Sequence, residues 1–217
     1  MGAALTLAST SMVGAQTMTP AGTWGSLPAG SFTGSGIPTN AVMTGGSGDA
    51  VIGLSATQRY ASAPVTNDGN GTFYAMSGNS IGAPVPPGDA GFANWNFDFF
   101  VGNHNATDVF TLYVDADPAS GNGLFDATTH AFVLGSGPGY ADSSNLGWGW
   151  GLPQVFDPNA AGQYSFALYQ RSAAGQDLSH VAINVNVTTT PEPSSLALLG
   201  TGFVGLVGFV KRRSRRA

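Results

Sequence analysis

The stretch Gln163–Val187, QYSFALYQRSAAGQDLSHVAINVNV, decides the fold class of this chain of 217 residues. In its first half, Tyr164, Phe166 and Leu168 alternate with residues that point the other way, and its second half alternates apolar and polar residues in the same manner. A period of two is typical of strands with one buried face. Ser172–Gly175 separates the halves with turn-forming residues. The stretch therefore predicts an antiparallel hairpin.

The same alternation recurs upstream of the hairpin. Trp95, Phe97, Phe99 and Val101 share one face of residues 94–101, and Asn and Asp residues occupy the other. Shorter strand patterns cover residues 51–56, 72–76, 109–114 and 131–134. About seven strands divided by Gly, Asn, Asp and Pro predict an all-β fold, an antiparallel β-sandwich of jelly-roll or Ig-like type, over residues 46–188. Residues 16–45 are rich in Gly, Ser, Thr and Pro and predict an irregular lead-in with room for one edge strand.

The charges are few and unevenly placed. Charged residues make up 9% of the chain, and it contains no Cys, which excludes disulfides, thiolate metal sites and Cys nucleophiles. Residues 16–190 hold eleven Asp but only Arg59 and Arg171, a net charge of −9. An acidic body with two cations cannot neutralise a phosphate backbone, so we expect no nucleic-acid partner.

The C-terminal end combines an apolar run with a basic cluster. Residues 194–210 carry no charge and, as a helix, span about 25 Å, the lower limit for crossing a bilayer. The run predicts a single transmembrane helix that attaches the protein to a membrane. Cations beside such a helix stay cytoplasmic, which places the body outside as an ectodomain. The basic residues are Lys211, Arg212, Arg213, Arg215 and Arg216.

The segment before that run contains Pro191, Glu192 and Pro193, which cannot continue a strand or a helix and so form an extended, accessible hinge. This triplet, the apolar run and the Arg-rich end together resemble the PEP-CTERM sorting signal of exported proteins in Gram-negative bacteria that make exopolysaccharide. The resemblance implies an inner-membrane intermediate, cleavage near the triplet by an exosortase, and a body left at the cell surface or outside the cell. It assigns residues 189–217 to a sorting tail. The alternative is an ordinary single-pass anchor on a proline-bearing stalk.

The body of the chain also resembles proteins of this kind, more loosely than the tail does. The hairpin at 163–187, with Asn145-Leu146-Gly147 and residues 156–159, resembles the ectodomains that commonly accompany PEP-CTERM tails. At the other end of the chain, Met1–Ala15 is small and apolar and carries no Lys or Arg. Its small residues Val13 and Ala15 predict the remnant of a signal peptide with cleavage after Ala15.

Catalytic patterns are missing from the sequence. The one Gly-x-Ser-x-Gly match, at residues 78–82, runs into three prolines and not into the helix that a nucleophile elbow needs. His104, His130 and His180 lack metal-binding or triad spacing. With eleven Asp, some carboxylate pair will lie close by chance, so a glycosidase pair is not identified by their number. We therefore expect no enzyme and no obligatory cofactor.

One acidic loop is a candidate metal site. Asp115, Asp117, Asn122 and Asp126 place oxygen ligands in a single turn, which suits a hard cation such as Ca²⁺. The spacing follows an EF-hand loop only in part, because its fifth and sixth positions lack the expected ligand and Gly. The alternative is a turn that uses Asp, Asn and Gly for backbone capping.

A Gly-rich segment with two indoles is the other candidate site. Trp148 and Trp150 lie two residues apart and can present flat rings for stacking on sugars. The alternative is burial in the core. Together these features predict an exported, surface-sorted, non-enzymatic protein with a structural or adhesive role in the envelope or the exopolysaccharide matrix. The other hypotheses are a glycan-binding module and a secreted polysaccharide hydrolase.

Overall fold

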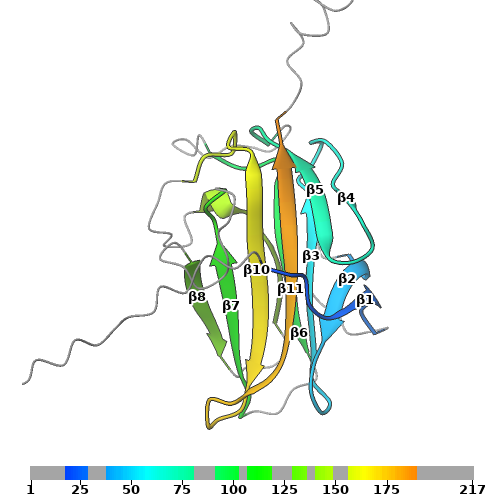
Figure 1. Cartoon of the computed structure of the whole chain (residues 1–217), viewed down its shortest axis with the longest axis vertical. Helices are drawn as coiled ribbons and strands as arrows, with labels where there is room; N and C mark the ends of the chain where they lie inside the picture. Colours follow the sequence, from blue (N-terminus) through cyan, green and yellow to red (C-terminus); the bar gives the residue numbers. More distant parts are fainter. Residues whose placement is uncertain are drawn as a thin grey trace, which may run out of the picture.

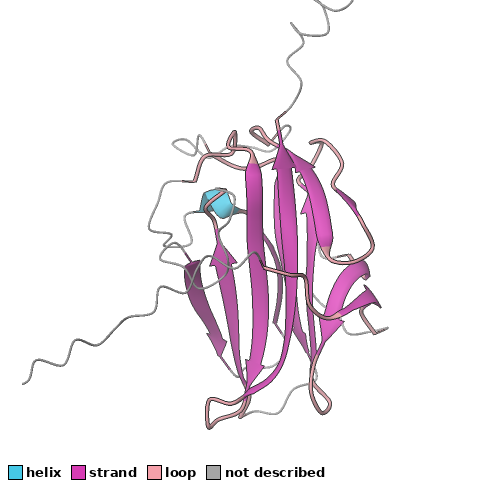
Figure 2. Ribbon diagram, viewed as in Figure 1, coloured by secondary structure: helices cyan, strands magenta, loops and turns pink. Residues whose placement is uncertain are grey.

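The computed structural model describes residues 18–28, 38–80, 91–102, 107–118, 129–135, 140–148 and 156–189 as two β-sheets packed face to face (Figures 1 and 2). The five-stranded sheet contains, in spatial order, β1 (Thr23–Ser26), β2 (Asn40–Gly45), β3 (Val51–Gln58), β6 (Trp95–Gly102) and β9 (Tyr140–Ser144). The six-stranded sheet contains, in spatial order, β4 (Thr66–Asn67), β5 (Thr72–Met76), β11 (Asp177–Thr188), β10 (Gly162–Arg171), β7 (Val109–Asp115) and β8 (Thr129–Gly135). The predicted all-β class is confirmed.

The predicted hairpin forms the centre of the six-stranded sheet. β10 and β11 pair antiparallel, with Phe166 opposite Ile183. The turn is closed by a hydrogen bond from the Gly175 N–H to the Ser172 carbonyl oxygen, 2.8 Å. Gly175 has φ +79°, a conformation that Gly adopts without a Cβ clash. The two longest strands are thus joined locally, as their alternation predicts.

The core lies between the sheets and is built from the alternating residues. Phe97 of β6 stacks on Phe166 of β10 with ring centroids 4.6 Å apart. Phe97, Phe99 and Phe166 are at most 1% exposed. The opposite face of β6 is also covered, since Asn96 is 8% and Asp98 0% exposed. The sequence pattern suggested a half-buried strand there, and β6 is instead buried on both faces.

Two parts of the arrangement differ from the prediction. β5 runs parallel to β11, so the six-stranded sheet is mixed rather than purely antiparallel. Residues 16–45 contain two strands, β1 and β2, instead of an irregular segment with a single edge strand. Before β1, Ala21 exchanges backbone hydrogen bonds of 2.8 and 3.1 Å with Ala182 of β11. The N-terminal segment therefore pairs first with one sheet and then enters the other.

Helical structure is confined to one short turn within the part of the chain that the structure describes, the 3-10 helix η1 (Leu146–Trp148). None of the described residues belongs to a helix long and apolar enough to cross a membrane. The predicted span 194–210 and the predicted signal segment 1–15 both lie outside the described residues.

Candidate functional site

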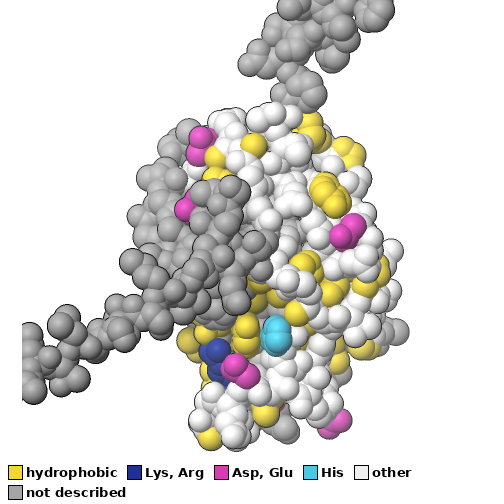
Figure 3. Space-filling model, viewed as in Figure 1, with side chains coloured by type: hydrophobic (Ala, Val, Ile, Leu, Met, Phe, Trp, Pro, Cys, Tyr) yellow, Lys and Arg dark blue, Asp and Glu magenta, His cyan; other side chains and the backbone are white. Residues whose placement is uncertain are grey.

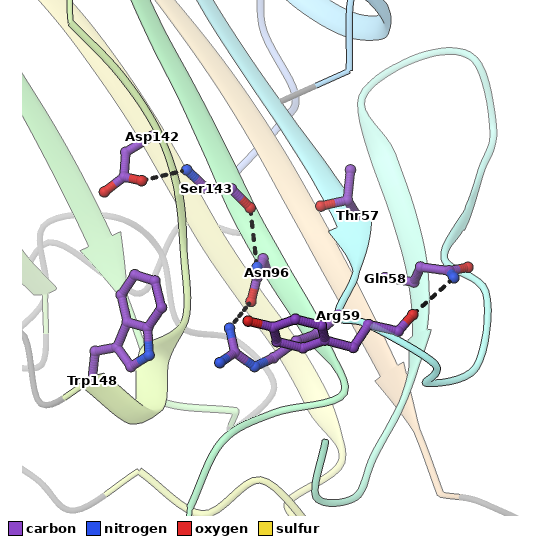
Figure 4. Close-up of a pocket in the computed structure, with 8 residues that line it drawn as sticks. Thr57, Gln58, Arg59, Asn96, Asp142, Ser143 and Trp148 are labelled. Atoms are coloured by element: carbon purple, nitrogen blue, oxygen red, sulfur yellow. Dashed lines mark hydrogen bonds between the residues drawn. The ribbon is translucent and has the colours of Figure 1, made fainter. Parts of the chain in front are cut away.

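A pocket of about 410 Å³ opens where β3 ends, beside β6, β9 and η1 (Figure 4). Strand register brings its walls together, because Thr57 pairs with Asn96 and Ser143 pairs with Asp98. Its volume lies within the range of about 300–1,000 Å³ usual for small-ligand sites. The described lining residues are Thr57, Gln58, Arg59, Tyr60, Asn96, Asp142, Ser143 and Trp148.

Arg59 is the cation of this pocket and is only 7% exposed. Its guanidinium carbon lies 4.9 Å from the ring centroid of Tyr60, 4.8 Å from that of Phe92 and 5.4 Å from that of Trp148. Its Nη1 donates a long hydrogen bond of 3.4 Å to the amide oxygen of Asn96. Its buried Nε has no hydrogen-bond partner among the described residues. Burial lowers the pKa of Arg59, yet a guanidinium remains charged at neutral pH.

Two aromatic rings stand at the pocket with much of their surface open. Tyr60 is 60% and Trp148 46% exposed, whereas Trp95 in the core is 2% exposed. Tyr60 adopts φ +48°, a left-handed conformation uncommon for a bulky residue. Such local strain is retained where the surrounding structure fixes it, often at functional sites. The Nε2 of Gln58 donates to the Tyr60 carbonyl oxygen, 3.2 Å, and holds this turn.

Asn145 fixes η1, and with it Trp148, against the start of β6. Its side chain is fully buried, and its Oδ1 accepts hydrogen bonds from the N–H groups of Ala93 and Gly147, both 3.0 Å. Its Nδ2 donates to the carbonyl oxygens of Ala93 and Trp95 and to the Asn96 side chain, at 3.1, 2.8 and 2.9 Å. All these partners are far from Asn145 in sequence except Gly147. The side chain therefore joins the loop to the sheet.

Gly147 is required by the close approach of this loop to a neighbouring backbone. A Cβ at this position would lie 2.1 Å from the carbonyl oxygen of Gly91, far inside van der Waals contact. Each residue of the motif Asn145-Leu146-Gly147 thus has a structural role. The Asn145 amide donates and accepts hydrogen bonds, Leu146 is 1% exposed, and Gly147 leaves room for the backbone of Gly91.

Two carboxyl groups on neighbouring strands, Asp142 of β9 and Asp98 of β6, lie in different surroundings. Asp142 lines the pocket, and its oxygens accept hydrogen bonds from the Ser143 N–H, 2.8 Å, and the Ser144 hydroxyl, 3.2 Å. Asp98 is fully buried and accepts a hydrogen bond of 3.2 Å from the Thr57 hydroxyl. Burial raises the pKa of Asp98 to about 7; hydroxyl groups of Ser143 and Thr57 oppose this rise, and the charge of Asp142 adds to it.

The pocket lies at the end of the sandwich where the chain leaves the last strand. The Ser77 N–H donates to the carbonyl oxygen of Thr188, the final residue of β11, at 2.8 Å. The Asn94 side chain donates to the Ser77 carbonyl oxygen at 3.1 Å, and the Arg59 N–H donates to the Asn94 carbonyl oxygen at 2.8 Å. Three hydrogen bonds therefore connect the backbone of the Arg59 turn with the end of β11.

The structure places one of the two candidate glycan-stacking residues in this pocket. Trp148 belongs to η1 rather than to a strand, and its exposure excludes the core position that was the alternative. Trp150 lies outside the described residues. Stacking on a sugar stays a prediction for both.

The candidate calcium loop is described only at its start. Asp115 ends β7 and is fully buried, and its Oδ1 accepts a hydrogen bond of 3.1 Å from the Asp117 N–H. This is the backbone capping expected of an Asp turn. Asn122 and Asp126 lie outside the described residues, and no cluster of three metal-ligating side chains occurs among the residues that the structure does describe.

A second aromatic group, which the sequence reading did not single out, covers part of the outer face of the six-stranded sheet. The Tyr169 ring stacks on His180 with centroids 4.9 Å apart, and Arg171 lies 5.1 Å from the Tyr169 centroid. Arg171 also forms an ion pair with Asp177. Figure 3 shows a His, a basic and an acidic side chain beside one another on the visible face. His104 and the side chain of His130 are outside the described residues.

Arg59 is the functional candidate that sequence reasoning missed. Its signal was present, since it is one of only two cations between residues 16 and 190. Its burial depends on Phe92 and Trp148, which follow it by 33 and 89 positions in the sequence. No periodic pattern links residues at such separations.

The chain ends in a recognised sorting element. Residues 189–216 match the family described as PEP-CTERM protein-sorting motif. The match begins one residue after β11 ends and contains Pro191, Glu192, Pro193 and the basic cluster, all outside the described residues. A comparison with curated proteins finds no match to the chain.

Proposed function

We propose that this chain, an exported protein sorted to the cell surface by its PEP-CTERM motif, has a structural or adhesive role in the envelope or the exopolysaccharide matrix and catalyses no reaction. The observation that carries the proposal is the position of the motif. It covers residues 189–216, and the last strand of the sandwich ends at Thr188. Removal of the tail would leave in place every strand that the structure describes.

The motif implies processing by an exosortase. In the proposed route, residues 194–210 cross the inner membrane as a helix, and the five basic residues that follow remain in the cytoplasm. The triplet Pro191-Glu192-Pro193, whose prolines disfavour both strand and helix, would then be the segment that the enzyme recognises. Cleavage there would release the sandwich to the surface or the matrix.

The chemistry of the pocket favours binding over catalysis. Asp142 is the one carboxylate among the described lining residues, whereas polysaccharide hydrolysis generally needs two carboxylates on either side of the scissile bond. The hydroxyl groups in the lining belong to Thr57, Tyr60 and Ser143, and no described lining residue is a His that could take a proton from them. A hydrolase is therefore the weakest of the three hypotheses.

A second candidate function, glycan binding, is favoured by the open rings of Tyr60 and Trp148 at the pocket. Sugars present flat apolar C–H faces together with many hydroxyl groups. Aromatic rings suit the first feature, and the Asn, Gln, Ser and Thr side chains of the lining suit the second. Such binding would hold the released sandwich in a polysaccharide matrix.

The sorting part of the proposal is tested by fractionating an exosortase-containing host that produces the full chain. Wild type and the neighbouring control Ser195→Ala are expected in the surface or matrix fraction, and Glu192→Ala is expected to accumulate in the membrane fraction. Equal distribution of all three proteins would show that the triplet does not direct sorting.

The non-catalytic role is tested with the host's purified exopolysaccharide and the full chain. We expect saturable retention of the protein on the polysaccharide and no increase in reducing ends over a heat-denatured control. New reducing ends that grow with protein concentration would replace the adhesive role with hydrolysis. Absence of retention would remove the adhesive role and the glycan-binding candidate together.

A further inference from the structure

Arg59 is a buried cation that no described carboxylate neutralises. The ion pair found among the described residues joins Arg171 to Asp177, on the other sheet. Arg59 instead contacts aromatic rings and one amide oxygen, and its buried Nε has no acceptor among the described residues. Buried charged donors in folded proteins are normally paired, so this guanidinium is one partner short.

The geometry around Arg59 restricts the shape of that partner. The rings of Tyr60, Phe92 and Trp148 all lie within 5.4 Å of the guanidinium carbon. A ring over the face of a guanidinium leaves the N–H donors in the guanidinium plane, and of these Nη1 already donates the long hydrogen bond to Asn96. A planar carboxylate fits such a fork through two parallel hydrogen bonds.

The charge beside Arg59 in the lining disfavours a doubly charged ligand. Asp142 belongs to the same lining, so its carboxylate would repel a dianion such as a phosphate monoester more strongly than a carboxylate. A singly charged anion is therefore the better match to Arg59.

We infer that the pocket binds a carboxylate-bearing sugar, a uronic acid unit of a polysaccharide, with its carboxylate on Arg59 and its ring against Tyr60 and Trp148. The lining residues Thr57 and Ser143 offer hydroxyl groups for hydrogen bonds to the sugar (Figure 4). The inference rests on the glycan-binding candidate above and names the class of sugar.

The test compares one oligosaccharide with and without its charge. The full chain is purified in a polyoxyethylene detergent, which has no sugar headgroup to compete, and is titrated calorimetrically with oligogalacturonic acid and with the same oligomers as methyl esters. Esterification removes the charge and keeps the sugar rings and hydroxyls. We expect the acid to bind about 10- to 100-fold more tightly than the ester, the range of a charge-assisted hydrogen bond.

Matched variants locate the selectivity. Arg59→Met is expected to bind acid and ester with equal affinity. Arg171→Met is the control, because Arg171 also stacks on two rings, those of Tyr113 and Tyr169, and is expected to keep the wild-type preference. Arg59→Lys keeps the charge without the planar fork and is expected to retain a reduced preference. If Arg59→Met fails to fold in urea titrations, the ester comparison on wild type and Arg59→Lys decides the question.

The results separate this inference from the function on which it rests. Equal binding of acid and ester by wild type would overturn acid recognition while leaving glycan binding intact. Acid preference that survives in Arg59→Met, or that Arg171→Met loses equally, would also overturn it. No binding of either oligomer would remove both the inference and the glycan-binding candidate. Preference for the acid that disappears in Arg59→Met, falls in Arg59→Lys and persists in Arg171→Met would support it.

Discussion

Replacement of Asp98 by Asn should make the sandwich more stable at neutral pH than the wild type. The Asp98 carboxyl is fully buried in β6, its Oδ1 accepts one hydrogen bond from Thr57, and its Oδ2 has no hydrogen-bond partner among the described residues. Burial, opposed by nearby hydroxyl groups and aided by the charge of Asp142, raises the pKa of Asp98 to about 7 from 3.8. The folded protein therefore holds a proton on Asp98 over a range of pH in which the unfolded chain has lost it.

The sign of the effect follows from proton linkage. Between about pH 4 and pH 7 the folded state binds more protons at this position than the unfolded state, so the free energy of unfolding falls as pH rises. The stabilisation that protonated Asp98 gives the folded state is fully present below pH 4 and is lost above pH 7. The folded and unfolded pKa values differ by about 3 units, which corresponds to about 4 kcal/mol of unfolding free energy. The free energy of unfolding of a typical domain is only about 5–15 kcal/mol, so this effect is a large part of it.

The assay is urea unfolding of the full chain, followed by tryptophan fluorescence at intervals between pH 4 and pH 8. Asp98→Asn keeps the side-chain shape and cannot ionise, so its advantage over wild type is expected to be small at pH 4 and to grow to a few kcal/mol, about 4 at most, by pH 8. Asp49→Asn, which removes a carboxylate from an exposed turn, is the control. An Asp98→Asn advantage that is constant across this range, or that shrinks as pH rises, would show that Asp98 has no raised pKa in the folded protein.

Three further predictions concern the loop and the candidate sites. Gly147→Ala places a Cβ 2.1 Å from a backbone carbonyl oxygen and should lower the free energy of unfolding by about 1–3 kcal/mol, whereas Gly25→Ala, with nothing within 4 Å, should change it by less than about 0.5 kcal/mol; equal effects in urea would contradict the packing. Trp148→Phe should remove more of the iodide-quenchable fluorescence than Trp95→Phe, because the two indoles are 46% and 2% exposed; an unchanged quenchable fraction would show that Trp148 is covered. For the loop Asp115–Asp126, calorimetric titration of the full chain at millimolar Ca²⁺ should give neither heat nor a rise in melting temperature, and either signal would establish the calcium site in place of the turn.

The central strands could be predicted because apolar and polar residues alternate within each of them. Phe97 and Phe99 in β6, and Tyr164 and Phe166 in β10, mark the buried faces at a period of two, and the turn at Gly175 joins β10 to β11. Large apolar residues at every second position indicate a strand whose apolar face packs on a core.

The edge strands β1 and β9 carried no such pattern. β9 reads Tyr-Ala-Asp-Ser-Ser and β1 reads Thr-Trp-Gly-Ser, and each is assigned to a sheet by backbone pairing with a neighbour. The parallel pairing of β5 with β11 joins segments more than 100 residues apart. Such pairing depends on the path of the whole chain, which local composition does not encode.

Of the pocket residues, the sequence pointed to Trp148, which is conspicuous in a Gly-rich segment and is 46% exposed in the structure. Its stacking on a sugar stays a prediction. Arg59 and Asn145 were not singled out as candidate site residues, because a lone Arg is usually a solvated side chain and a lone Asn is usually a turn residue. Their roles come from tertiary contacts with Phe92 and Ala93 that no motif records.

The most direct test of the account is the intact mass of the protein recovered from the surface or matrix of an exosortase-containing host. We expect a C-terminus near Pro191-Glu192-Pro193, with the apolar run and Lys211, Arg212, Arg213, Arg215 and Arg216 absent. The same chain produced without an exosortase should retain them. Surface protein from the exosortase-containing host that still ends at Ala217 would contradict the account.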